Sequence, residues 1–411
     1  MPSAIVLGAG MAGVAAALQL QSRGWSVALI DRQAPGRATS YGNAGFIQSE
    51  AVEPYAMPRD LASLVAIAMG RTNDVRYILA TLPSHVGPLL RYWWHSAPER
   101  YAAIATAYAS IIAQAAPQHE TLMNASGVSN LVRRDGFRAL LRSQAALDMA
   151  AARAERFRAN YGVRSRLLSA AELAQAEPAL KNVGIGALHW LDTWTVKDPG
   201  GLVRAYADLF VRSGGAFSHG DAASLRQASG AGWVVDTESG KAEAEHVVVA
   251  LGPWSPELLR RFGYRYPMVR KRGYHRHFRG GAALDLPLQD PGFGHVIAPM
   301  AMGLRITTGA ELTGPDAPAR PVQLGRAEQA ARGLLDLGEP VEKEPWFGTR
   351  PCMPDMLPVV GPASRHAGLW MHFGHGHQGF TLGPATGRML ADLMTGQTPF
   401  ADPTPFRPDR Y

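Results

Sequence analysis

The chain has a single cysteine, Cys352, among its 411 residues. One cysteine cannot form a disulfide within the chain, which agrees with a reducing compartment. No stretch reaches the roughly eighteen uncharged apolar residues that a membrane-spanning helix needs, and the longest apolar helix candidate, Leu61 to Met69, is too short. The N-terminus lacks the positively charged lead of a signal peptide. We therefore expect a cytoplasmic protein.

Long basic tracts, low-complexity segments and short repeats are also lacking, so the sequence gives no sign of nucleic-acid binding. The net charge is nevertheless +7, and basic residues form small clusters at 133–134, 260–261 and 270–272. We interpret these clusters as solvated surface. Two alternatives stay open, namely steering of an anionic substrate and peripheral contact with the anionic inner face of a membrane. A chain of this length favours two domains.

The first 31 residues carry the strongest pattern. A short apolar strand, Ala4 to Leu7, is followed by G-A-G-M-A-G, an alanine-rich helix, a second apolar strand and an acid. Glycines at these spacings permit a tight turn, close approach of a pyrophosphate and close packing of helix on sheet, and the acid can bind a ribose hydroxyl. This predicts a dinucleotide site but does not distinguish FAD from NAD. The residues expected at it are Gly8, Gly10, Met11, Ala12, Gly13, Asp31 and Arg32.

The next segment, T-S-Y-G-N-A-G at 39–45, consists of small and turn-forming residues and predicts a loop that returns toward the glycine turn. Ser40, Asn43 and the backbone of Ala44 and Gly45 could donate hydrogen bonds to phosphate or flavin atoms. An ordinary polar surface loop is the alternative for this stretch taken alone.

Residues 58–160 are expected to be mostly helical, including helices at 61–68, 101–114 and 137–161, and their apolar faces predict helix–helix packing more than a membrane surface. Ser169 and Glu172 match a capping box, and 201–212 and 326–337 predict two further helices. An edge strand is expected to start at Ala216.

Two later segments have the order strand, glycine turn, helix. The run 246–250 predicts a buried parallel strand, and the turn at Gly252 after it is placed to meet the cofactor. The run 369–373 predicts another strand, followed by a glycine-rich loop at 374–383 and a last helix at 385–394. The end of the chain therefore repeats the arrangement found at its beginning.

The loop at 39–45, the segment G-T-R-P-x-x-P-D-x-x-P-x-x-G at 348–361 and G-H-G-x-x-G at 374–379 resemble the FAD-dependent amine-oxidising family that includes D-amino-acid dehydrogenase, glycine oxidase, sarcosine oxidase and D-amino-acid oxidase. Bacterial D-amino-acid dehydrogenases are the most similar group. The resemblance extends over nearly the whole chain. It implies an α/β fold, α+β overall, with a Rossmann-like, GR2-type FAD domain and a substrate domain of antiparallel sheet plus helices.

The resemblance also implies domain boundaries and the state of the cofactor. The FAD domain would be discontinuous, formed by 1–50, 198–262 and 346–411, and the substrate domain would combine 51–197 with 263–345. The FAD would be non-covalent, because the cysteine that links to flavin in sarcosine oxidase lies earlier relative to the P-D pair than Cys352 does.

A flavin amine dehydrogenase needs a clamp for the substrate carboxylate, and the planar fork of an arginine suits it best. Arg350 heads the motif whose arginine holds that carboxylate in relatives, and the alternative is a surface salt bridge to Asp355 or Glu344. Tyr274 matches a tyrosine seen near the substrate, although a tyrosine of the sheet core would look the same. Tyr55 could close over the pocket or serve structure alone.

The histidines at 372, 375 and 377 have the form H-x-x-H-x-H, but no cysteine or carboxylate completes a metal site, and none is predicted. The flanking glycines favour close approach of backbone N–H groups to the pyrimidine end of the flavin. His377 could instead contact substrate. The residues expected at this end of the cofactor are Gly376, His377, Gln378, Gly379, Phe380 and Thr381.

The resemblance therefore implies oxidation of a D-amino acid, or of a cyclic imino acid such as D-proline or hydroxyproline. Hydride would pass from Cα to flavin N5, and the electrons would leave to a quinone-like acceptor. An oxidase of the same family that uses O₂ is the alternative, and an NAD-dependent dehydrogenase or a non-catalytic flavin-binding protein are more distant ones. The sequence does not indicate an oligomeric state.

Overall fold

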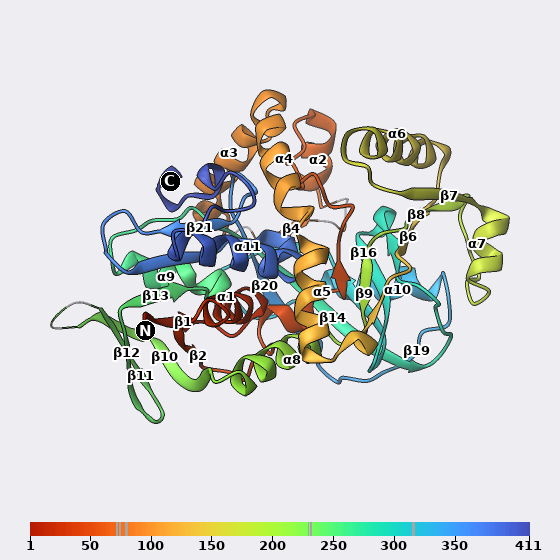
Figure 1. The fold of residues 1–411 in the computed structure, drawn as a ribbon. Coiled ribbons are helices and arrows are strands. Elements are labelled where there is room, and N and C mark those ends of the chain that lie inside the picture. Colours follow the sequence, from red (N-terminus) through yellow and green to blue (C-terminus); the bar gives the residue numbers. More distant parts are fainter. Residues whose placement is uncertain (71–72, 74, 79–80, 229, 231, 315–316) are drawn as a thin grey trace.

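The structure, a computed structural model, describes residues 1–411 except 71–72, 74, 79–80, 229, 231 and 315–316 (Figure 1). The helices are α1 (Met11–Gln21), α2 (Leu61–Ala68), α3 (Leu82–His95), α4 (Pro98–Ile112), α5 (Ala115–Ser126), α6 (Gln144–Tyr161), α7 (Ala170–Ala176), α8 (Pro199–Arg212), α9 (Ser255–Arg260), α10 (Val322–Arg332) and α11 (Gly379–Met394). Within these ranges, no helix combines the length and the apolar character needed to cross a bilayer.

The strands fall into an eight-stranded sheet, an eleven-stranded sheet and a three-stranded sheet. The first contains β1 (Ser3–Leu7), β2 (Ser26–Asp31), β10 (Ala216–Gln227), β11 (Trp233–Thr237), β12 (Gly240–Ala244), β13 (His246–Val249), β21 (Val359–Pro362) and β22 (Leu369–Phe373). The second contains β4 (Val75–Tyr77), β6 (Phe137–Leu141), β7 (Ser165–Ser169), β8 (Gly186–Trp190), β14 (Val269–Gly280), β15 (Leu288–Asp290), β16 (His295–Met300), β17 (Gly303–Thr308), β18 (Ala310–Leu312), β19 (Gly338–Pro340) and β20 (Trp346–Cys352). The third contains β3 (Phe46–Ile47), β5 (Val132–Arg133) and β9 (Trp194–Val196).

The eight-stranded sheet has a parallel centre in the order β10, β2, β1, β13 and β22. Ile5 of β1 pairs with Ala28 of β2 on one side and with Val247 of β13 on the other. These strands are almost continuously apolar and buried, as expected for a parallel sheet covered on both faces. The prediction of an α/β fold with a Rossmann-like sheet is confirmed.

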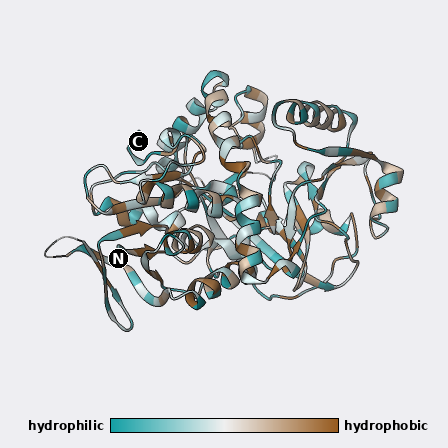
Figure 2. Ribbon diagram, viewed as in Figure 1, coloured by the Kyte–Doolittle hydropathy of each residue, from teal (hydrophilic) through white to brown (hydrophobic). Residues whose placement is uncertain are grey.

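Helices α1 and α11 pack closely against each other over this sheet (Figure 1). A Cβ at Gly383 would lie 2.8 Å from Met11 Cγ, and one at Gly387 would lie 3.0 Å from the backbone nitrogen of Ala16. The two glycines and the alanines of α1 therefore allow the short separation between these helices. Figure 2 shows apolar residues along the central strands, in agreement with the buried core.

The eleven-stranded sheet has β14 near its centre, where it pairs with β17, β18, β19 and β20. Side chains alternate along this long strand. Tyr274 and Phe278 pack on one face in a core with Leu324 and Ala327 of α10. Lys271 and Gly273 line a large cavity on the other face. β14 therefore separates a structural core from the cavity.

Several expectations for individual elements are wrong at their boundaries. Residues 137–141 form the fully buried strand β6 instead of the start of a helix, because short apolar runs do not distinguish the two structures. β10 starts at Ala216 but lies between β2 and β11, so it is no edge strand. The helix expected at 326–337 is α10, which runs from Val322 to Arg332. Residues 346–352 form β20 and pair with β14 of the larger sheet, while the domain boundaries given above stay a prediction.

The last helix also differs, because α11 begins at Gly379 and contains Pro384. Proline has no N–H to donate to the carbonyl of Phe380 four residues earlier. That carbonyl oxygen is instead 2.9 Å from Nε2 of the buried His119, whose Nδ1 is 3.1 Å from the hydroxyl of Tyr206. A side chain from α5 thus replaces the missing backbone donor and lets the helix pass through the proline.

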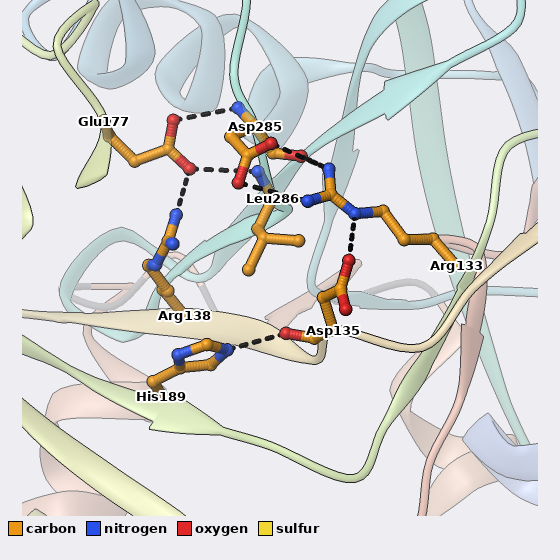
Figure 3. Close-up of polar contacts among 7 residues, drawn as sticks. All are labelled: Arg133, Asp135, Arg138, Glu177, His189, Asp285 and Leu286. Carbon is orange, nitrogen blue, oxygen red and sulfur yellow. Dashed lines mark hydrogen bonds and ion pairs between the residues drawn. The ribbon is translucent and has the colours of Figure 1, made fainter.

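A buried ion pair joins β6 to the end of α7, next to the segment before β15 (Figure 3). The Glu177 carboxylate accepts a charge-assisted hydrogen bond from Arg138 and backbone N–H bonds from Asp285 and Leu286, both at 2.9 Å. Nearby, Arg133 binds the Asp285 carboxylate. The capping box of α7 is confirmed, since Ser169 and Glu172 each accept a hydrogen bond from the other's backbone N–H.

Candidate active site

A cavity of about 1510 Å³ runs between the two sheets. One end is bordered by the glycine turn and Asp31, and the other by Lys271, Arg350 and the segment 375–380. A cavity of this size exceeds the usual range for a single small ligand and leaves room for a dinucleotide together with a substrate. Almost all of the residues predicted at the cofactor and substrate therefore lie around one continuous space.

The glycine turn has the geometry that a pyrophosphate needs. Gly8 has φ +108°, and a Cβ there would lie 2.5 Å from the Ala250 carbonyl oxygen. A Cβ at Gly13 would lie 1.7 Å from the carbonyl oxygen of Gly8. No larger residue fits at either position without moving backbone. Gly8, Gly10, Met11 and Ala12 border the cavity, whereas Gly13 supports the turn from behind.

Asp31 and Ser40 hold this turn in place. The Asp31 carboxylate accepts hydrogen bonds from the N–H of Ala9 at 2.7 Å and of Gln33 at 2.9 Å. The Ser40 hydroxyl accepts one from the N–H of Met11 at 3.0 Å, and its own proton remains available to a phosphate. Arg32 lies over the ring of Trp254, 4.7 Å from its centroid, at the cavity wall beside Gly252.

The loop at 39–45 is fixed from within and from the larger sheet. Asn43 Oδ1 accepts hydrogen bonds from the N–H of Gly45 and of Phe46. Arg305 Nη1 donates to the carbonyl oxygens of Tyr41 at 2.9 Å and Asn43 at 2.6 Å. Asn43 and Ala44 border the cavity. Gly45 has φ +79°, and a Cβ there would lie 2.4 Å from the Val196 carbonyl oxygen, so its role is in the backbone of the loop.

Arg305 is itself anchored by β14. Its Nε is 2.9 Å from His277 Nε2, and His277 Nδ1 is hydrogen-bonded to Glu342. Burial lowers the pKa of Arg305 to about 10, and burial together with Arg305 lowers that of His277. A series of hydrogen bonds from Glu342 through His277 and Arg305 therefore connects the larger sheet to the loop at 39–45.

The segment 376–381 forms a short 3₁₀ turn, Gly376–Gln378, that leads into α11. The side chain of Gln378 donates to Gln48 Oε1 at 2.6 Å, and Thr381 Oγ1 is 3.2 Å from both the Gln48 N–H and the Phe46 carbonyl oxygen. These bonds tie the N-terminus of α11 to the segment after the loop at 39–45. Gly376 to Phe380 border the cavity, and Thr381 lies behind them.

Arg350 enters the cavity from β20. Its Nη1 donates to the Gly309 carbonyl oxygen at 2.8 Å, and its Nη2 donates to that of Thr308 at 3.0 Å. Burial lowers the pKa of its guanidinium, and among the described residues no carboxylate lies within ion-pair distance. The alternative of a salt bridge to Asp355 is wrong, because Asp355 pairs with Arg410. The guanidinium is thus oriented by neutral carbonyls and keeps its charge for an anion.

The two tyrosines predicted near the substrate lie in different surroundings. The ring of Tyr55 is 5.4 Å from that of His377 in an edge-on contact, and both residues border the cavity. Tyr274 also borders it, but its hydroxyl donates to Glu311 at 2.9 Å and accepts the Arg320 N–H at 3.0 Å. This hydroxyl belongs to the buried face of β14 that carries Arg272.

The interpretation of 270–272 as solvated surface is wrong. Lys271 is 9% exposed and faces the cavity, whereas Arg272 is 1% exposed and donates to the carbonyl oxygens of Ala317 and Pro318 on the other face. Sequence reasoning therefore missed Lys271 as a cavity residue. The alternation along 269–278, with glycine at 273, was the available signal, since a strand places neighbouring residues on opposite faces.

The three histidines near the C-terminus separate into two groups. His372 and His375 both have Nε2 within 2.9 Å of Thr386 Oγ1, and of these two histidines only His375 borders the cavity. His377 lies at the wall itself, where burial first, and then Arg350 and Lys271, hold its pKa well below the ordinary value. His275, His277 and Glu342 are close enough to share a cation, but the Arg305 guanidinium bonds directly to His277 there.

These residues fit an FAD. The pyrophosphate would meet the N–H groups at the start of α1 and the Ser40 hydroxyl, and a ribose would meet Asp31. The isoalloxazine would reach the segment 376–380, where the N-terminus of the sixteen-residue α11 favours negative charge. Arg350 and Lys271 lie at that end, which places the cations beside the group that reacts.

Comparison with known proteins agrees with this assignment. The model of the FAD dependent oxidoreductase family matches residues 3–393. A D-amino acid dehydrogenase of Chromohalobacter salexigens is 29% identical, with 99% of each chain covered, and one of Cereibacter sphaeroides is 31% identical, with 99% of this chain and 95% of the relative covered. A protein of Bradyrhizobium diazoefficiens named D-amino-acid oxidase is 29% identical, with 99% of this chain and 98% of the relative covered.

Solved structures show the same fold. Glycine oxidase from Geobacillus kaustophilus superposes with a TM-score of 0.73 at 22% identity, and all of both chains is covered. Together with the family match over almost the whole chain, this identifies the cofactor of the large cavity as FAD. The chain is a member of the FAD dependent oxidoreductase family and an enzyme.

Proposed function

We propose that the protein is an FAD-dependent dehydrogenase that oxidises the Cα–N bond of a D-amino acid or of a cyclic imino acid such as D-proline or hydroxyproline. The observation that carries the proposal is Arg350, a half-buried arginine whose guanidinium faces the cavity without a carboxylate partner among the described residues. An anionic group of the substrate supplies that partner. Full-length relatives named D-amino acid dehydrogenase support the choice of amino acid.

A bound FAD would be held by the glycine turn, Asp31 and Ser40, and it would supply the acceptor for the substrate hydride. The chain's own residues have three tasks. Arg350 binds the carboxylate and thereby orients the substrate. Tyr55 and His377 border the space around it and restrict its shape and water content. His377 is neutral at pH 7, because its pKa is held well below the ordinary value, so it adds no further positive charge against a protonated amine.

The test is anaerobic reduction of the bound flavin by a panel of D- and L-amino acids, glycine, sarcosine and hydroxyproline. Loss of the visible flavin absorption with D-amino acids is expected. Reduction only by L-amino acids, glycine, sarcosine or a hydroxy acid would refute the substrate proposal.

The electron acceptor is proposed to be a quinone at a membrane surface. Two stripes of apolar side chains with spacing i, i+4, i+8 support this, one on α2 and its C-cap and one on α3, at the same end of the molecule (Figure 1). Their members are Leu61, Val65 and Met69, and Val86, Leu90 and Trp94, all exposed. Arg59 and Arg100 lie against the rings of Trp93 and Trp94 beside the stripes.

Ser63 and Ile67 of α2 line the cavity and lie on the opposite side of that helix from its stripe. An apolar acceptor held at a bilayer would thus be close to the cavity wall. Sedimentation with vesicles of anionic phospholipid tests the contact, and the variant Leu61→Glu with Leu90→Glu should abolish it. Equal sedimentation of the variant would refute the membrane proposal.

An oxidase that passes electrons to O₂ is the second candidate, because one relative is named D-amino-acid oxidase. Hydrogen peroxide released at the rate of substrate turnover would establish it. Turnover with a soluble quinone analogue that far exceeds turnover with oxygen would favour the dehydrogenase.

A further inference from the structure

The reactive end of the cavity contains two cations on one face of the sheet. Lys271 of β14 and Arg350 of β20 are direct partners in the antiparallel register, so their side chains leave the sheet on the same face. The Arg350 guanidinium covers Gly273, where a Cβ would lie 2.7 Å from Nη1. The Lys271 ammonium extends the other way and lies 4.6 Å from the centroid of the Tyr92 ring. The two charged heads thus diverge.

Neither cation has a carboxylate partner among the described residues. The acids that border the cavity are already engaged. Asp31 accepts hydrogen bonds from the N–H groups of Ala9 and Gln33, and Asp221 accepts one from that of Ala223. Glu53 pairs with Arg156, Asp290 with Arg142 and Glu257 with Arg270. Glu50 bonds to Thr193 and Gln48, and burial raises its pKa.

Cys352, Tyr92 and His377 lie beside Lys271. Burial raises the pKa of the Cys352 thiol and of the Tyr92 phenol, and burial with the two cations lowers that of His377. Burial also acts to lower the pKa of Lys271, but the acidic groups of Cys352 and Tyr92 beside it outweigh burial and leave that pKa raised. The ammonium therefore has polar neighbours but no carboxylate beside it among the described residues. A buried cation in such surroundings is stabilised by an anion that binds beside it.

Space for that anion is present. A small cavity of about 30 Å³ adjoins the large one and is lined by Lys271, Tyr92, Tyr108, Cys352 and His377 among others. Lys271 lines both cavities, whereas Arg350 lines only the large one, so Lys271 alone can bind a group that enters the small cavity. A ligand that satisfies both must carry two anionic groups.

We propose that Lys271 binds the side-chain carboxylate of an acidic D-amino acid, aspartate or glutamate, whose α-carboxylate is held by Arg350. This inference rests on the proposed function, since it specifies the substrate of the same site. The amine and the Cα–H then lie between the two anchors, and the side chain cannot rotate freely.

Holoenzyme kinetics test the proposal with charge-matched pairs of substrates. The ratio of kcat/KM for D-aspartate over D-asparagine, and for D-glutamate over D-glutamine, should be at least about 10 in the wild type. Lys271→Met should lower this ratio about 10- to 100-fold through KM, with little change for the amides. Lys271→Arg should keep most of the preference for the acid over the amide.

A matched control is Arg276→Met, which removes a cation from the same strand but from the face turned away from the cavity, where Arg276 pairs with Glu328. It should leave the ratio unchanged. Binding provides a readout without turnover, because succinate and glutarate should perturb the flavin spectrum of the wild type at lower concentration than butyrate, and lose this advantage in Lys271→Met.

The outcomes separate the two proposals. If neutral D-amino acids reduce the flavin but acidic ones are no better than their amides, the Lys271 proposal is overturned and the dehydrogenase stands. The same holds if Lys271→Met keeps the ratio, or if Arg276→Met lowers it equally. If no D-amino acid of any charge reduces the flavin, the proposed function itself fails.

Discussion

Individual side chains in this cavity are defined by their hydrogen-bond partners more than by their type. Arg350 and Arg272 are both arginines with carbonyl acceptors, yet the first faces the cavity and the second faces away from it. The motif R-P-x-x-P-D indicated Arg350 correctly as a cavity residue. The alternation along 269–278 was the sequence signal for Lys271, but its position opposite Arg350 depends on the cross-strand register of the folded sheet.

Arg350→Ala tests the carboxylate clamp at this scale. We expect normal flavin content, because the guanidinium bonds to Thr308 and Gly309 and not to the glycine turn. Loss of a charge-assisted bidentate contact should lower kcat/KM for amino-acid substrates about 100- to 1000-fold, or roughly 3–4 kcal/mol. Steady-state kinetics measure it, and kinetics equal to the wild type would remove Arg350 from the substrate site.

Secondary-structure elements in this protein supply hydrogen-bond donors to each other's backbone carbonyl groups. The proline in α11 is tolerated because α5 supplies His119, and the loop at 39–45 keeps its form because β17 supplies Arg305. The sequence predicted the glycine turn, the loop and the helix after 374–383, since these depend on local composition. It did not predict Pro384 within a helix, because the compensating donor is distant in the chain.

The pairing of His119 with the Phe380 carbonyl can be measured by a double-mutant cycle. His119→Leu should destabilise the protein by about 1–3 kcal/mol, because it leaves a buried carbonyl without a donor. In a Pro384→Ala background the restored N–H can donate to that carbonyl, so the same substitution should be less harmful there by about 1 kcal/mol. Urea unfolding of the four proteins gives both values, and additive effects would contradict the pairing.

Arg305→Met tests the connection between the larger sheet and the loop at 39–45. We expect the loop at 39–45 to lose its fixed form and FAD to bind about 10- to 100-fold more weakly, since two carbonyl acceptors and His277 lose their donor. Flavin fluorescence gives the Kd. Arg226→Met, which removes a half-exposed ion pair to Asp236, is the control and should bind FAD as the wild type does.

The molecule as a whole buries many histidines in their neutral form. Burial lowers the pKa of His119 to about 4, of His375 to about 3 and of His275 to about 2. In the unfolded chain each titrates near pH 6.5. Between these values the unfolded state binds protons that the native state does not, so native stability falls as the pH drops below about 6.5. Glu50 and Glu177, whose pKa values burial raises, act in the opposite direction but are fewer.

We therefore expect the free energy of unfolding to fall by on the order of 2 kcal/mol per buried histidine between pH 7.5 and pH 5. Urea unfolding across this range measures it. In His275→Gln the unfolding free energy should fall less than in the wild type, by the amount expected for one histidine, because one group no longer takes up a proton on unfolding. A pH dependence identical to that of the wild type would show that His275 is protonated in the native state.

The overall fold could be predicted further than the site could. The parallel strands β1 and β13 and the order of the cofactor-binding segments follow from apolar runs and glycines, which act locally. The placement of β20 against β14, and hence of Arg350 beside Lys271, is a tertiary result. The residues that meet in the active site come from distant segments, and only the pairing of strands shows which of them share a face.

The packing of α1 against α11 has a consequence for biosynthesis. Met11 and Ala16 contact glycines of a helix that a ribosome makes only after all of the larger sheet, at roughly 5–20 residues per second. During those tens of seconds the nascent glycine turn lacks both its covering helix and the segment 376–380. The wall that closes the cavity over the glycine turn is therefore complete only once the last helix has been made.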